Sequence, residues 1–78
     1  MAKHTFQVVL EWDPRSESWV TYVPALEFLS TYGKSRDEAL EKTREAILGY
    51  LEAAAKEGIP VPSEAVNAEL VSLEISVA

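Results

Sequence analysis

The sequence predicts a small α+β domain with the element order β-β-β-α-β, in which one long helix packs on one face of a mainly antiparallel four-stranded sheet. Three observations predict this class. Apolar and polar residues alternate close to the N-terminus, and they alternate again over residues 67–77. Between these segments, apolar residues recur at helical spacing for about 22 residues. A chain of 78 residues has room for one domain, which we place at residues 1–78.

The first two strands are predicted to form a hairpin. Residues 5–12 and 18–23 alternate with period two, and an Asp-Pro pair opens the turn between them. A hairpin centred on this turn places Trp12 opposite Trp19, so that the two rings close its end. The other predicted pairs are Val8–Val23, Val9–Tyr22, Leu10–Thr21 and Glu11–Val20.

A short third strand is predicted over residues 29–32, ended by Gly33. Ser35 then opens the helix, because a serine followed three residues later by Glu38 forms a capping box. The helix is predicted to end at Gly58 in a Schellman cap, with a proline just beyond.

The last strand is predicted over residues 67–77, after a proline-containing linker. Its alternation puts a set of β-branched and leucine side chains on the face that the helix covers. The predicted core face of the sheet consists of Phe6, Val8, Leu10, Trp12, Trp19, Val23, Val71, Leu73, Ile75 and Val77.

The opposite face of the predicted sheet is not cleanly polar, since Val9, Val20, Tyr22 and Leu70 share it. A contiguous apolar group on a surface suggests a partner. We therefore predict that these residues, or an exposed strand edge, form the interface of a homo-oligomer (a dimer or tetramer) or of a partner protein. Oligomerisation is also a common remedy for the small core of so short a chain.

Composition narrows the function. The chain carries 13 acidic and 7 basic residues, with a formal net charge of -6. This balance argues against direct nucleic-acid binding, which Lys and Arg drive, and is compatible with a basic protein partner. The lack of cysteine excludes disulfides and thiolate metal sites. No apolar run resembles a membrane span or a signal peptide, so we expect a cytoplasmic protein.

No catalytic, cofactor-binding or metal site is predicted. His4 is the single histidine and cannot by itself supply a zinc site or a catalytic triad. Glu11 and Asp13 are the nearest approach to paired carboxylates. A magnesium-dependent nuclease that uses them is the least favoured of the alternatives.

Four short motifs, in order and at fitting spacing, resemble the HicB-like antitoxin family. They are residues 19–26 (WVTYVPAL), 30–35 (STYGKS), 37–42 (DEALEK) and 58–62 (GIPVP). The resemblance covers about residues 5–64, most of the chain. The sequence departs from the family pattern where Phe28 and Leu29 replace the Gly-Cys that commonly follows the Pro-x-Leu segment.

The resemblance implies a partly RNase H-like fold, homo-oligomers and the neutralisation of a small basic RNA-cleaving toxin of the HicA type. It thus implies a non-enzymatic binding module that sequesters this toxin without a cofactor. Many family members also carry a C-terminal DNA-binding module. The sequence up to Ala78 shows none, so we expect no direct contact with DNA. The alternative is an orphan homo-oligomeric domain with a structural or adaptor role and no toxin.

Overall fold

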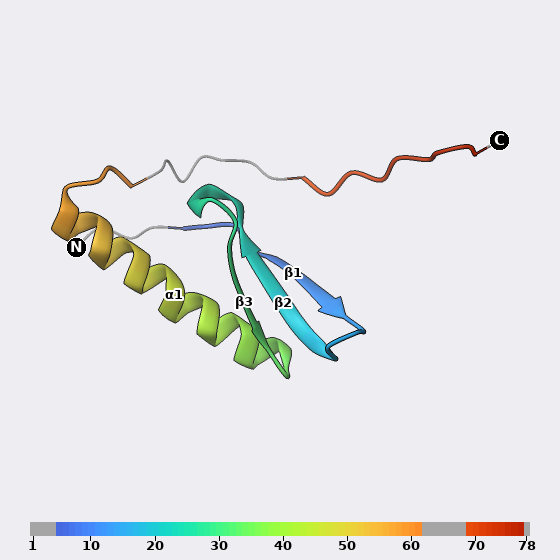
Figure 1. The fold of residues 1–78 in the computed structure, drawn as a ribbon, viewed down its shortest axis with the longest axis horizontal. Coiled ribbons are helices and arrows are strands. Elements are labelled where there is room, and N and C mark those ends of the chain that lie inside the picture. The colour runs from blue at the N-terminus through green and yellow to red at the C-terminus, as the bar shows by residue number, and fades with distance from the viewer. Residues whose placement is uncertain (1–4, 62–68, 78) are drawn as a thin grey trace.

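The computed structural model describes residues 5–61 and 69–77. In these residues the chain forms three antiparallel strands followed by one long helix (Figure 1). The strands lie in the order β1-β2-β3, and a short 3-10 turn, Pro24–Leu26, joins the last two. The elements are β1 (Val9–Asp13), β2 (Ser18–Val23), β3 (Leu29–Gly33) and α1 (Arg36–Glu57).

The predicted hairpin register is confirmed from Val9 onward, whereas β1 is shorter than predicted and the expected Val8–Val23 pair is not part of the ladder. Trp12 pairs with Trp19, and their rings meet edge to face with centroids 5.5 Å apart. The turn is held by Asp13, whose carboxylate accepts hydrogen bonds from the Arg15 backbone N–H at 3.1 Å and from the Ser16 hydroxyl at 2.9 Å. Alternation and turn chemistry therefore suffice to set this pairing.

Both predicted ends of α1 are also confirmed. The Ser35 hydroxyl oxygen accepts a hydrogen bond from the Glu38 backbone N–H at 3.0 Å. The second bond of the expected capping box is different. The carboxylate of Glu38 accepts a hydrogen bond from the Lys34 backbone N–H at 3.3 Å instead of from the Ser35 backbone N–H. At the other end Gly58 has a φ of 67°, and the next N–H donates to Ala54 O at 2.9 Å, as in a Schellman motif.

The helix lies over β3 and β2 and away from β1 (Figure 1). Gly33 at the end of β3 permits this approach, because a Cβ there would stand 2.6 Å from the backbone nitrogen of Ala39. The core is correspondingly small. Its buried apolar side chains are Val23, Leu26, Ala39 and Ala54.

Three threonines join the apolar side chains in the contact between the sheet and the helix. The hydroxyl of Thr21 on β2 lies 2.6 Å from that of Thr43 on α1 and 2.9 Å from that of Thr31 on β3. The Thr43 hydroxyl donates to the carbonyl of Ala39 at 2.7 Å. This satisfied cluster ties both strands to the first turns of the helix, because buried hydroxyls are costly without partners.

The expected four-stranded sheet is wrong, and with it the β-β-β-α-β order and the RNase H-like arrangement. Residues 69–77 form no strand in the structure, while residues 67 and 68 of the expected strand lie outside the described residues. The four side chains of this segment that were expected in the core are 68–89% exposed: Val71, Leu73, Ile75 and Val77. Alternating apolar and polar residues indicate a segment with two different faces. A β-strand also needs a second backbone to pair with, and the local sequence pattern does not specify that partner.

The β2–β3 connection holds two consecutive non-glycine residues in the left-handed region, Glu27 (φ 56°) and Phe28 (φ 59°). Phe28 is 66% exposed, so little burial offsets its strain. We expect Phe28→Gly to raise the free energy of unfolding by about 1 kcal/mol, measured by urea denaturation. Tyr32→Gly is the control, since it removes a similarly exposed ring from β3 and should destabilise. Equal destabilisation by both variants would contradict the inference that the backbone at Phe28 is strained.

Candidate protein-binding surfaces

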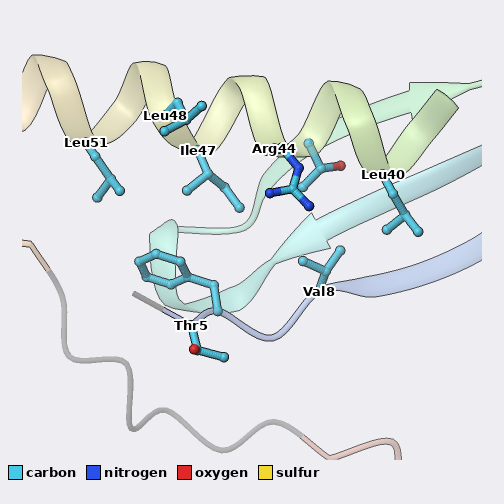
Figure 2. Close-up of a pocket in the computed structure, with 9 residues that line it drawn as sticks. Thr5, Val8, Leu40, Arg44, Ile47, Leu48 and Leu51 are labelled. Carbon is cyan, nitrogen blue, oxygen red and sulfur yellow. The ribbon is translucent and has the colours of Figure 1, made fainter. Parts of the chain in front are cut away.

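A groove of about 590 Å³ separates α1 from the stretch that precedes β1 (Figure 2). It exists because α1 sits over β3 and β2, which leaves the side of the helix nearest to β1 uncovered. The residues that line the groove are Thr5, Phe6, Val8, Leu40, Thr43, Arg44, Ile47, Leu48 and Leu51.

The groove is mostly apolar. Leu40, Ile47 and Leu51 project from the helix toward the segment that carries Val8 (Figure 2). Leu48 is 53% exposed. Leu40, Ile47 and Leu51 belong to the apolar residues that recur at helical spacing in the sequence, and these were expected to pack on the sheet. The local pattern does not indicate that part of this stripe stays uncovered.

The segment of residues 69–77, called the arm below, begins beside this region. Glu69 and Leu70 line a second cavity of about 330 Å³ together with residues 7–9. Beyond Leu70 the arm, orange to red in Figure 1, runs away from the sheet and the helix. Its apolar side chains alternate with polar ones and make no core contact.

Three of the four predicted interface residues share the sheet face that points away from α1, called the open face below. Thr21 bonds to the helix, so its neighbours Val20 and Tyr22 point to the other side. Val9 pairs directly with Tyr22 and joins them there. Leu70 does not: it belongs to the arm and is 92% exposed. The interface role of all four stays a prediction.

An acidic residue sits within the open face. Glu11 pairs with Val20 and so lies beside Tyr22 on this face. Partial desolvation raises the pKa of Tyr22, and the carboxylate of Glu11, with a smaller contribution from Asp13, raises it further. Tyr22 therefore stays neutral at physiological pH and presents a phenol beside a carboxylate.

In the described residues, Glu11 and Asp13 of the nuclease alternative are not part of a group that could hold a metal ion. In residues 5–61 and 69–77, no group of three or more histidine, cysteine, aspartate or glutamate side chains is placed to hold a metal ion. Asp13 is engaged in the hairpin turn, and Glu11 lies beside Tyr22. His4 lies outside the described residues.

Comparison with family models, with curated proteins and with solved structures gave no match to this chain. The resemblance to HicB-like antitoxins thus stays an expectation from short motifs. Within the part of the chain that the structure describes, no helix combines the length and apolar character needed to cross a bilayer.

Proposed function

We propose that this protein is a non-enzymatic antitoxin-like module that sequesters a small basic ribonuclease of the HicA type. The observation that carries the proposal is the composition of the open face. It sets half-buried Val9, Val20 and Tyr22 around the carboxylate of Glu11, on a chain with a net charge of -6. An apolar face that carries a carboxylate, on a chain of net negative charge, suits a partner whose surface is basic.

Several residues of the motifs behind the family resemblance have structural roles away from the open face, while Val20 and Tyr22 of the first motif lie on that face. The Pro24–Leu26 turn buries Leu26 to 2% exposure, and Gly33 admits the helix. Ser35 caps α1. The helix covers the other face of the sheet, so a partner can reach the open face without unfolding any element.

The test is a search for a small basic protein encoded beside this gene, followed by measurement of its binding to, and inhibition by, this chain. The full chain should suppress its RNA cleavage at a fixed stoichiometry, and the affinity should fall as salt rises. Glu11→Lys should weaken binding about 10-fold, or ~1.4 kcal/mol, in calorimetry.

Glu52→Lys is the matched control, because it changes the net charge equally at an exposed helix position away from the open face. It should weaken binding far less than Glu11→Lys. Equal loss in both variants would point to bulk charge and contradict the role of the open face. Lack of any complex, or of a neighbouring toxin-like reading frame, would favour the orphan alternative.

A further inference from the structure

The chain exposes more surface than a compact monomer of its size. Its accessible surface is 6442 Å², whereas a compact protein of 8.6 kDa exposes about 4,700 Å². The Cα radius of gyration is 15.0 Å, against roughly 11.5 Å for a compact chain of this length. The excess, about 1,700 Å² per chain, is as large as the total area buried in a typical specific interface.

Two uncovered apolar features lie in the described part of the same chain. The arm holds Val71, Leu73, Ile75 and Val77 in the solvent, all with the same alternation. The groove offers an apolar helix wall opposite the residues that lead into β1, and no described strand pairs with the outer edge of β1 itself. An exposed strand-like segment and such an edge are complementary, because the edge of a sheet presents backbone N–H and C=O groups to a further strand.

The dimensions of the two features agree. The apolar part of the arm, from Val71 to Val77, spans about 20 Å when extended, and the groove wall from Leu40 to Leu51 spans about 17 Å along the helix. An arm lying along β1 would turn alternate side chains toward α1, as a strand does. Its four apolar residues share one such face.

The charge of the groove lining also suits the arm better than it suits a basic segment of another protein. Of the described residues that line the groove, Arg44 alone is charged. The arm carries Glu69 and Glu74 and no basic residue. A basic partner would meet Arg44 with like charge, whereas the arm has no basic residue and carries Glu69 on the same face as its four apolar side chains. The groove and the open face therefore suit different occupants.

We propose that the arm of one copy of this chain docks along the outer edge of β1 in a second copy, with its apolar face in the groove. The chain's own arm does not fill its groove: Glu69 and Leu70 stand beside residues 7–9, and the arm then runs outward. In a reciprocal exchange, each arm lies in the groove of the other copy, so one two-fold symmetric interface buries both arms and fills both grooves. The arm contacts another chain, so the sheet within each chain still has three strands. The dimer does not depend on the binding of a toxin.

Analytical ultracentrifugation of the full chain tests the exchange. The wild-type chain should reach twice its mass of 8.6 kDa at micromolar concentration. Leu73→Asp with Ile75→Asp should raise the dimer dissociation constant at least about 100-fold, because it places charge in the apolar contact. Ser72→Asp with Ser76→Asp adds the same charge to the other face of the arm and should change it less than about 5-fold. A monomeric wild type, or equal effects in the two variants, would overturn the proposal.

Crosslinking distinguishes exchange from closure within one chain. The sequence has no cysteine, so each introduced thiol is unique. A Leu73→Cys chain mixed with a Leu48→Cys chain should form a heterodimer with a short bismaleimide, and Ser72→Cys should react with it much less. A single chain carrying both Leu73→Cys and Leu48→Cys that crosslinks internally, at monomer mass, would overturn the proposal.

Discussion

Gly33→Ala is expected to lower the free energy of unfolding by about 3 kcal/mol. The added Cβ would stand 2.6 Å from Ala39 N, 2.9 Å from Glu38 C and 3.0 Å from Ala39 Cα. All three atoms belong to the helix backbone, so no side chain can swing aside and α1 itself must move. That movement would also disturb the threonine cluster, since Thr43 donates to the carbonyl of Ala39.

Gly49→Ala is the matched control, because it adds the same methyl group in the middle of α1. No atom lies within 4 Å of the added Cβ, and alanine favours helix over glycine. This variant should stabilise the protein by about 1 kcal/mol. Chemical denaturation of both variants gives the comparison. A loss of less than about 1 kcal/mol for Gly33→Ala would show that the helix does not press on β3 as described.

Leu26→Ala is expected to cost about 3 kcal/mol, which is a large part of the stability of so small a domain. Leu26 is 2% exposed and is the largest fully buried side chain among the described residues. Two of the other buried apolar residues, Ala39 and Ala54, are small, so little else compensates for its loss. Thermal unfolding followed by circular dichroism measures the effect.

The control for that site is Leu26→Met, which nearly conserves volume and should cost less than about 1.5 kcal/mol. A similar loss for the two variants would mean that shape at this site matters more than the buried volume. A negligible loss for Leu26→Ala would contradict the location of the core between α1 and the β2–β3 side of the sheet.

Local signals predicted the parts of the fold that depend on neighbours in sequence. The hairpin follows from alternation on both sides of a turn that Asp13 stabilises. The helix limits follow from Ser35 and Gly58, whose caps need only nearby backbone groups. Three members of the predicted interface reach one face for the same reason, because pairing in register fixes the side on which each side chain lies.

The signals failed where the outcome depends on distant partners. The arm has a strand pattern, yet the pattern is equally compatible with pairing inside the chain or between chains. The helix was expected to cover the sheet face, but its close contact through Gly33 draws it toward β3 and opens the groove. The threonine cluster was not predicted, because the meeting of Thr21 and Thr43 depends on how the helix docks on the sheet.

Filling of the groove by the arm of a second copy is tested most directly by amide hydrogen exchange of the full chain at low and high micromolar concentration. Exchange between copies predicts that amides of residues 69–77 and of the outer edge of β1 become protected together as the concentration rises. An arm that stays unprotected at both concentrations, or that is equally protected at both, would contradict it.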